Sequence, residues 1–161
     1  MSIKIRPASR SDLPALERLL RDAFDASYAL FMPAAYVREW RMSETPAETL
    51  RKLQGDMAVA VSGETVVGFV ATENDTVAEL WVAPDRKRRG IGAKLLHWAE
   101  DRLRDRGSGD VTLSCYERNS NGLDFYRKMG YVVTSRTPSR RVAGGPVTVC
   151  TLKKHLDAGS R

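Results

Sequence analysis

The chain has 161 residues, of which 42% are hydrophobic and 29% are charged, so it has the composition of an ordinary globular protein and enough length to bury a core. It contains no run of about 18 apolar residues, which excludes a typical membrane-spanning helix, and its first residues lack the apolar stretch of a secretory signal. The formal net charge of +6 favours a polyanionic partner, such as nucleic acid, an acidic membrane or a small ligand that carries phosphates. We expect one domain over residues 1–161, located in the cytoplasm and not bound to a membrane.

The first half of the chain predicts a strand, a capped helix, two shorter helices and a meander of three strands. Ser9 and Asp12 have capping-box spacing, and apolar residues at helical spacing follow them. Two prolines interrupt the next region, which limits its helices to short ones. Pro84 ends the last strand because proline cannot donate to a ladder. The expected ranges are 3–6 for the first strand, 13–24 for the capped helix, 34–41 and 47–54 for the short helices, and 57–61, 66–72 and 77–82 for the meander.

The second half predicts a long helix, a strand, a short helix and two final strands. One side of the long helix is apolar, and Gly107 and Gly109 end it. We expect the last residues, 155–161, to be frayed. The expected ranges are 91–106 and 119–130 for the helices and 111–115, 131–134 and 147–152 for the strands. This order of elements predicts a mixed α/β fold that binds its ligand where neighbouring strands diverge.

The two cysteines, Cys115 and Cys150, both lie in apolar segments that resemble strands. Buried free thiols in a reducing compartment explain them better than a disulfide framework. Neither cysteine has metal-ligand spacing with His97 or His155, so we expect no metal site.

The segment between the meander and the long helix, residues 85–92, is the most informative part of the sequence. Gly90 and Gly92 let the backbone approach a ligand closely. The first amides of a helix have no internal partner, and the helix dipole adds partial positive charge at the same end. Four consecutive cations, residues 86–89, surround it. The segment therefore predicts a phosphate-binding site, and the alternatives are a solvated turn or a nuclear-localisation signal.

Two common phosphate-binding patterns do not fit this segment. A P-loop needs Gly-Lys-Ser/Thr, but Ala93 follows Gly92. A dinucleotide-binding fingerprint needs Gly or Ala where Leu95 stands. The run Pro84-Asp85-Arg86-Lys87-Arg88-Arg89-Gly90-Ile91-Gly92 instead resembles the signature Pro-x-x-Arg/Gln-x-x-Gly-x-Gly/Ala of the GNAT superfamily of N-acetyltransferases. The chain departs from the signature at Lys87, which lacks the planar, bidentate head of arginine.

A second segment, residues 119–131, is similar to the N…FY…GF segment of the same family, and the order of elements matches over residues 3–153. The resemblance implies a GNAT-like α/β (α+β) single domain, with a mixed, mostly antiparallel twisted sheet of about six to seven strands flanked by helices and a splayed central strand pair. It also implies acetyl-CoA as the cofactor and acetyl transfer by direct attack of a primary amine. The cofactor-binding residues that it implies are Leu80, Trp81 and Val82 along the pantetheine arm, Lys87, Arg88, Arg89, Gly90, Ile91, Gly92 and Ala93 around the diphosphate, and Asn119 and Tyr126 on one face of the short helix.

By the same resemblance, Tyr126 is the general acid that protonates the CoA sulfur. A phenol near pKa 10 can protonate a thiolate near pKa 8.5 only if the site lowers the uphill gap. The alternative for Tyr126 is a core aromatic residue beside Phe125.

The general base stays open at this point. Several family members carry Glu or His on the strand before the phosphate-binding segment, but Thr76 and Ala78 stand at those positions, and Ser114 stands where others carry a carboxylate. Glu79 is adjacent, and on a regular strand it would face the other way unless a bulge re-aims it. The alternatives are a water relay and the carboxylates of Asp25, Glu39 or Glu44.

Aromatic residues are concentrated between residues 25 and 54, and this region is the candidate for the acceptor site. We expect Tyr28, Phe31 and Tyr36 to bind the substrate, a small molecule with a primary amine such as a polyamine. The alternative is that these residues only pack a helix on the sheet. Other functions stay open: an acyl-CoA-binding module without turnover, an acetyltransferase for a protein or aminoacyl-tRNA amine, and a nucleic-acid-binding domain, which the lack of interleaved aromatics disfavours. A homodimer is the default oligomer.

Overall fold

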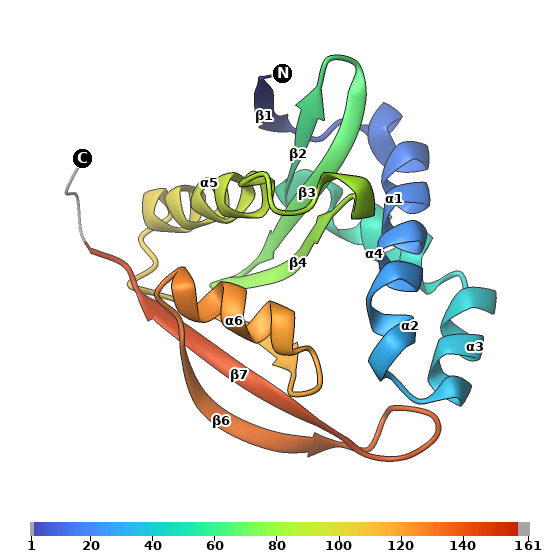
Figure 1. Cartoon of the computed structure of the whole chain (residues 1–161). Coiled ribbons are helices and arrows are strands. Elements are labelled where there is room, and N and C mark those ends of the chain that lie inside the picture. Colours follow the sequence, from blue (N-terminus) through green and yellow to red (C-terminus); the bar gives the residue numbers. More distant parts are fainter. Residues whose placement is uncertain (1, 158–161) are drawn as a thin grey trace.

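The computed structural model describes residues 2–157, and their strands form one twisted sheet in the order β1-β2-β3-β4-β5-β7-β6 (Figure 1). The β4–β5 pair is parallel and the other pairs are antiparallel. The strands are β1 (Ile3–Pro7), β2 (Met57–Ser62), β3 (Thr65–Glu73), β4 (Thr76–Val82), β5 (Asp110–Tyr116), β6 (Val132–Ser139) and β7 (Val147–His155).

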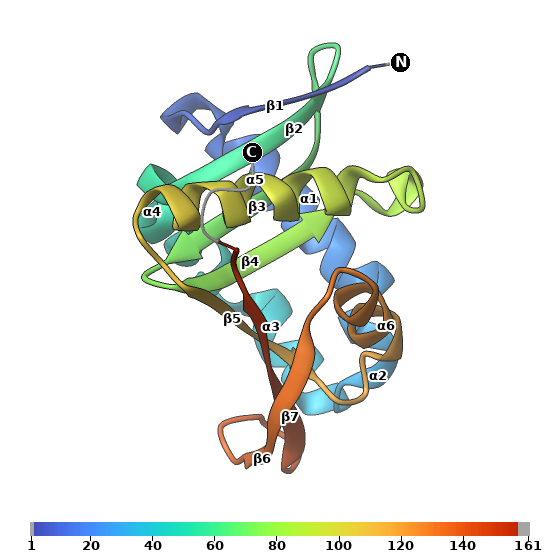
Figure 2. The same ribbon diagram turned by 90° about the vertical axis from the view of Figure 1, so that its left-hand side faces the viewer.

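Helices cover both faces of the sheet (Figure 2). Helix α5 packs on β2, β3 and β4 from one face, whereas α1 and α4 pack on β3 from the other. The helices are α1 (Leu13–Ala26), α2 (Tyr28–Phe31), α3 (Ala34–Met42), α4 (Thr45–Leu53), α5 (Ile91–Asp105) and α6 (Ser120–Lys128). Among residues 2–157, none of them combines the length and the apolar character that crossing a membrane requires.

Alternation along β3 divides the core between the two faces. Val70 belongs to the cluster under α5, which also contains Leu95 and Leu96, whereas its neighbours Phe69 and Ala71 belong to the cluster under α1 and α4. Because strand side chains alternate between faces, one buried strand supplies both clusters. The central strands are thereby fixed in register, since a slip of one residue would exchange the two sets.

The sheet opens between β4 and β5. The two strands share one register pair, Thr76 with Thr112, whose hydroxyls lie 3.0 Å apart. Beyond that pair β4 continues along β3 while β5 turns away with β7 and β6 (Figure 2). The sheet is therefore split into two halves, and the split begins at the carboxyl side of Thr76.

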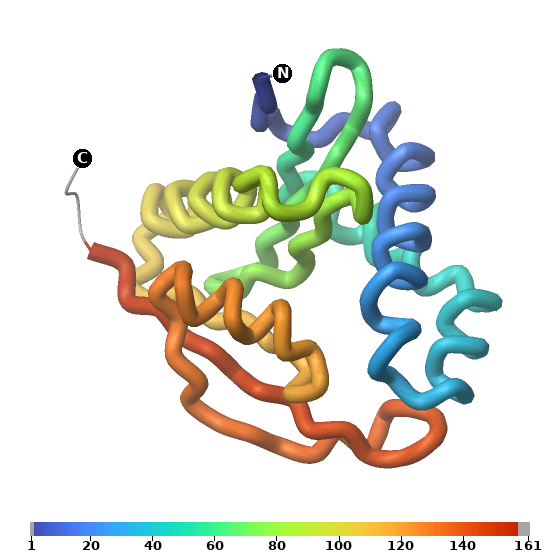
Figure 3. The backbone as a smooth tube through the Cα atoms, viewed as in Figure 1, coloured from blue at the N-terminus to red at the C-terminus, as the bar shows by residue number. Residues whose placement is uncertain are grey.

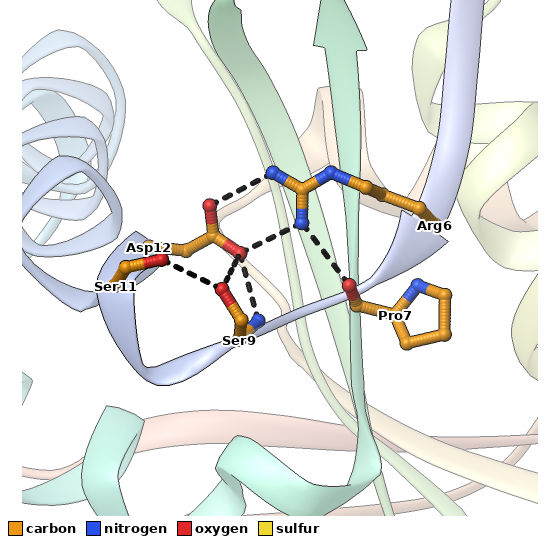
Figure 4. Close-up of polar contacts among 5 residues, drawn as sticks. All are labelled: Arg6, Pro7, Ser9, Ser11 and Asp12. Atoms are coloured by element: carbon orange, nitrogen blue, oxygen red, sulfur yellow. Dashed lines mark hydrogen bonds and ion pairs between the residues drawn. The ribbon is translucent and has the colours of Figure 1, made fainter.

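The start of α1 is tied to the edge strand β1 by a polar network (Figure 4). The Arg6 guanidinium donates to both carboxylate oxygens of Asp12, at 2.8 and 2.9 Å, and the Ser9 amide donates to the same carboxylate at 2.8 Å. These interactions lower the pKa of Asp12 from 3.8 to about 2, with the arginine as the largest cause. The predicted capping box is thus present, with Asp12 largely buried.

A loop between β6 and β7 docks against α2 and α3, on the far side from β1 (Figure 3). Val142 is buried with Phe24 and Val37. Gly144 has φ +94°, and a Cβ there would lie 2.7 Å from Pro33. The loop is therefore held against the helical layer by close packing.

The predicted fold class is confirmed, and so is the splayed strand pair. The short helix α2 was not predicted. The prediction of a frayed chain from residue 155 is wrong at its start, because β7 extends to His155 and Leu156 is 3% exposed and donates its amide to Gly109. Residues 158–161 lie outside the described part, so the prediction of one domain over residues 1–161 stays a prediction.

The last strands also differ from their predicted ranges. The first of them, β6, begins at Val132 and extends to Ser139, because it pairs with β7 as far as Val147. Tyr131 precedes it and is buried, with its hydroxyl donating to Glu100 at 2.7 Å. Lys154 contacts the same carboxylate at 3.1 Å, so the charge of this buried glutamate is compensated.

Candidate active site

A cavity of about 540 Å³ lies where β4 and β5 diverge, and we refer to it as the β4–β5 cavity. It lies between the two half-sheets, the helices α1 to α4 and the loop after β6. Its lining is mostly aromatic or polar. The lining residues are Leu20, Phe24, Tyr28, Tyr36, Glu39, Trp40, Ser43, Thr45, Pro46, Thr49, Ala78, Glu79, Trp81, Ser114, Cys115, Tyr116, Arg141, Ala143 and Val149.

A bulge in β4 turns Glu79 into this cavity. Ala71 of β3 pairs with Glu79, but the next residue, Thr72, pairs with Val77, so Ala78 is the extra residue on β4. Consecutive residues on a regular strand face opposite sides, yet both Ala78 and Glu79 line the cavity. The bulge that the sequence argument required for Glu79 is therefore present.

The Glu79 carboxylate is half-buried and has one close partner. The Trp81 indole Nε1 donates to Glu79 Oε2 at 2.6 Å. Burial raises the pKa of Glu79 above its usual value, and the hydrogen bond from Trp81 opposes that rise. A carboxyl group whose pKa is moved toward neutrality has the property that a general base needs.

Two of the alternative carboxylates lie away from the cavity, and one lines it. Asp25 forms an exposed ion pair with Arg41 at 2.8 Å, and neither Asp25 nor Glu44 lines the β4–β5 cavity. Glu39 does line it, with an exposed side chain. The cavity thus contains two carboxylates, Glu79 on its β4 wall and Glu39 on its α3 wall.

Tyr126 lies on α6, next to the cavity but not in its lining. Its ring packs edge-on against Phe125 at 5.3 Å and Tyr131 at 5.9 Å. Burial raises its pKa well above 10, and the negative charges of Cys115 and Glu79 would raise it further. The phenol is therefore protonated at neutral pH. It also lies close enough to Glu79 for the charge of that carboxylate to act on it.

Two of the three predicted substrate residues line the cavity. Tyr28 packs at 4.9 Å from Trp81 and at 5.7 Å from Tyr116, and Tyr36 lines the same wall. Phe31 packs against Tyr28 at 5.1 Å and is not part of the lining, so its substrate role stays a prediction.

Several lining residues were not assigned to the site from the sequence, and two of them are Tyr116 on β5 and Arg141 in the loop after β6. Each comes from the second half of the chain and reaches the cavity only because β5 and β7 turn away from β4. No local pattern marks either residue, so only the path of the backbone identifies them.

The basic loop, residues 83–90, joins β4 to α5 at the end of the sheet where β4 ends (Figure 3). Gly90 is the N-cap of α5 with φ +79°, a conformation that favours glycine, and no side chain within residues 2–157 caps the helix. Lys87, Arg88 and Arg89 are exposed, and among residues 2–157 they form no ion pair with a carboxylate. Uncapped amides, a helix dipole and free cations fit the diphosphate of CoA.

The two glycines of the loop serve different purposes. A Cβ at Gly90 would meet nothing within 4 Å, so its backbone conformation is what requires glycine. A Cβ at Gly92 would lie 3.3 Å from Cζ of Phe125, so the missing side chain there admits a ring from α6. Gly92 thus serves internal packing in the first turn of α5.

The other predicted cofactor residues lie beside the strand split. Leu80, Trp81 and Val82 are half-buried on β4 beyond the single β4–β5 pair, so the β4 edge that faces β5 is open to a ligand there. Asn119 is the N-cap of α6, and its side-chain oxygen accepts from the Gly122 amide at 3.0 Å. Its capping role leaves the side-chain NH₂ group for a ligand.

Known proteins with similar sequences include N-acetyltransferases. The chain is 27% identical over 145 residues to spermidine N(1)-acetyltransferase of Thermoplasma acidophilum, covering 83% of this chain and 90% of that one. It is 28% identical over 137 residues to peptidyl-lysine N-acetyltransferase YjaB of Salmonella typhimurium, covering 85% and 88%.

Solved structures show the same fold. A GCN5-related N-acetyltransferase from Rhodopseudomonas palustris superposes with a TM-score of 0.84 at 21% identity, covering 97% of each chain. The PaiA N-acetyltransferase from Thermoplasma acidophilum, solved in complex with coenzyme A, superposes with a TM-score of 0.75 at 24% identity, covering 97% of this chain and 100% of that one.

The model of the acetyltransferase (GNAT) family matches residues 13–131, a range that begins with α1 and ends just after α6. It includes the strand split, the basic loop and the helix with Tyr126. With acetyl-CoA as its acyl donor, this chain belongs to the GNAT family of N-acetyltransferases.

Proposed function

We propose that this N-acetyltransferase acetylates a primary amine of a small molecule, with a polyamine-like cation as the favoured class. The observation that carries the proposal is the β4–β5 cavity of about 540 Å³, which has Glu79 on one wall and aromatic rings around it. Aromatic faces attract cations, and carboxylates compensate their charge. A spermidine acetyltransferase among the relatives supports the same class of acceptor.

Glu79 is proposed to accept the proton that the ammonium must lose. Its carboxylate faces the cavity, and burial raises its pKa toward the range where a carboxylate can take a proton at neutral pH. Glu39, on the α3 wall of the cavity, has an exposed side chain and is placed to attract the second charge of a diamine.

Tyr126 is proposed to hold the proton that the leaving sulfur requires. Its phenol stays protonated at neutral pH because burial raises its pKa. That rise widens the difference in pKa between the phenol and the CoA thiolate. Tyr126 can therefore act as the acid only if the occupied site lowers this difference. Acetyl-CoA, when bound, supplies the activated acyl group.

The basic loop and the open edge of β4 are proposed to hold the cofactor. The amides at the start of α5 and the cations of the loop would bind the diphosphate, and the main chain of Leu80 to Val82 would pair with the pantetheine arm. Asn119 would contribute its NH₂ group from the start of α6.

A thiol-release assay with acetyl-CoA tests the proposal. The panel contains a polyamine, a diamine, a monoamine, free amino acids and a lysine peptide, since one relative acetylates peptidyl lysine. We expect kcat/KM for the polyamine to exceed that for the peptide about tenfold or more, because a small cation fits within the cavity. A peptide that reacts faster than every small amine would contradict the proposal.

A further inference from the structure

Trp81 connects the proposed base to the aromatic wall of the cavity. Its indole donates to Glu79 at 2.6 Å, and its ring centroid lies 4.9 Å from that of Tyr28. Beyond the bulge, Glu79 and Trp81 are two residues apart on β4 and so face the same side. The bulge therefore brings the carboxylate and the indole together on the cavity side of the strand.

We propose that Trp81 is a positioning residue for catalysis, which holds the Glu79 carboxylate toward the acceptor amine and favours its ionised form. The inference rests on the proposed function, because it takes Glu79 as the base. Trp81 acts through Glu79 and needs no contact with the amine itself.

The hydrogen bond is the feature that gives the indole this role. Among residues 2–157, the Trp81 N–H is the only group within hydrogen-bonding distance of the Glu79 carboxylate. A hydrogen bond to an ionised acceptor is stronger than one between neutral groups. Because Glu79 is partly buried, the loss of that donor would disfavour the charged carboxylate.

The indole itself is held by neighbours on two sides. Trp81 packs between the cluster under α1 and α4 and the cluster that contains Phe24 and Val142. Its main chain pairs with Phe69 of β3, so the backbone position does not depend on the indole. A Trp81→Phe variant keeps an aromatic ring in this packing and removes the N–H donor.

Four of the titratable groups around Glu79 stay neutral over the acid range in which a carboxyl group titrates. Burial raises the pKa of the Tyr28, Tyr36 and Tyr126 phenols, and it raises that of the Cys115 thiol to about 11. These four groups are therefore neutral near pH 7. The groups that face Glu79 from the surrounding elements are Tyr28 on α2, Tyr36 and Glu39 on α3, Cys115 and Tyr116 on β5, Tyr126 on α6 and Arg141 in the loop after β6.

The first test is the pH dependence of kcat/KM for Trp81→Phe, with the best amine of the panel. We expect the acid limb to move up by about one pH unit, because a charge-assisted hydrogen bond is lost. Activity should fall most on the acid side of the profile and recover toward the wild-type level as the pH rises. Trp98→Phe is the matched control, since Trp98 lies on α5 beside Arg102 and away from the cavity. An equal loss at every pH would overturn the proposal.

The second test is a double-mutant cycle with Glu79→Gln. If Trp81 acts through Glu79, adding Trp81→Phe to Glu79→Gln should change kcat/KM by less than about twofold. If Trp81→Phe lowers kcat/KM as much in the Glu79→Gln background as it does in the otherwise unchanged protein, the positioning role is refuted. If Glu79→Gln alone retains full activity, the base assignment in the proposed function fails instead.

The third test needs no turnover and observes the indole N–H directly. The indole N–H resonance of Trp81, assigned by its absence in Trp81→Phe, should shift in a pH titration of the free protein. The titration should disappear in Glu79→Gln. A resonance that does not titrate in the wild type, or that titrates equally in Glu79→Gln, would show that the indole does not sense this carboxylate.

Discussion

The basic loop and the β4–β5 cavity both adjoin β4, but the chain builds them differently. The loop is one continuous segment, residues 83–90, followed directly by the uncapped start of α5. The cavity takes its walls from four helices, three strands and the loop after β6. The loop binds with main-chain groups and flexible cations, whereas the cavity depends on the orientation of individual side chains.

This difference separates cofactor binding, which the family shares, from the choice of acceptor, which can differ between its members. Backbone amides at a helix start recognise a diphosphate whatever the neighbouring side chains are. A cavity made of side chains from distant segments changes with each of them. Mutations in the loop should therefore alter CoA affinity, and mutations in the cavity should alter turnover and acceptor choice.

The largest effect should come from Glu79→Gln, which removes the proposed base from the cavity and keeps its shape. We expect kcat to fall about 10²-fold or more, because a positioned base contributes on that scale, with the Kd for CoA nearly unchanged. Steady-state kinetics and calorimetry check the two quantities. Glu39→Gln is the matched control, and an equal loss in both variants would mean that overall charge, not a base, matters.

Tyr126→Phe should have the next largest effect. Removing the hydroxyl should lower kcat about tenfold or more, because the proposed acid is lost while the ring still packs against Tyr131. CoA binding should remain nearly intact by calorimetry. Unchanged turnover would remove Tyr126 from the mechanism and leave it a packing residue.

Gly90→Ala should affect the loop and leave the cavity unchanged. The alanine would have to adopt φ +79°, which costs about 1–2 kcal/mol, or else shift the amides at the start of α5. We expect a lower melting temperature and a Kd for CoA raised about tenfold, with the acceptor preference retained. Gly55→Ala is the control, because a Cβ there meets nothing and its φ is not positive. If Gly90→Ala changed the preference among acceptor amines, the proposed separation of roles between the loop and the cavity would be contradicted.

Asp12→Asn should have the smallest effect, since the Arg6–Asp12 network lies outside both regions. The folded pKa of about 2 is below the usual 3.8, so the contribution to stability is complete above pH 4 and is lost as the pH falls through 2. The Arg6 side chain is 46% exposed, which limits the contribution to about 1 kcal/mol. Urea unfolding at pH 7 and pH 3 measures it. The control is Asp25→Asn, at the exposed pair with Arg41, which should lower the free energy of unfolding by less. A loss of activity in Asp12→Asn would show that the β1 edge affects the active site.

Sequence patterns predicted the order of the elements well, because most of them carry local signals. The capping box, the paired apolar faces of α1 and α5, and the glycine-ended helices are each visible within a short window. Helix α2 and the full length of β6 carry no such signal. The helix has four residues, and β6 is stabilised by pairing with β7 across a loop.

The parts of the site that are continuous segments of the sequence were predictable. The parts that the fold brings together from distant segments were less so. Residues 84–92 and 119–131 matched motifs, and the bulge that turns Glu79 into the cavity followed from asking how an adjacent residue could reach it. Tyr116 and Arg141 could not be assigned, because their place depends on how far β5 turns away from β4. The hydrogen bond from Trp81 to Glu79 was not predicted from the sequence either, because it forms only when the two side chains turn toward each other on the same side of β4.

The contact between Gly92 and Phe125 sets a distance within the enzyme. The ring of Phe125 rests on the first turn of α5, in the space that a side chain at residue 92 would occupy. The next residue along α6 is Tyr126, so the packing of Phe125 on Gly92 sets how closely the helix that carries the proposed acid approaches the helix start that would bind the diphosphate. A Cβ at Gly92 would lie 3.3 Å from that ring, so the larger side chain of Gly92→Ala would press Phe125, and the helix that carries it, away from α5.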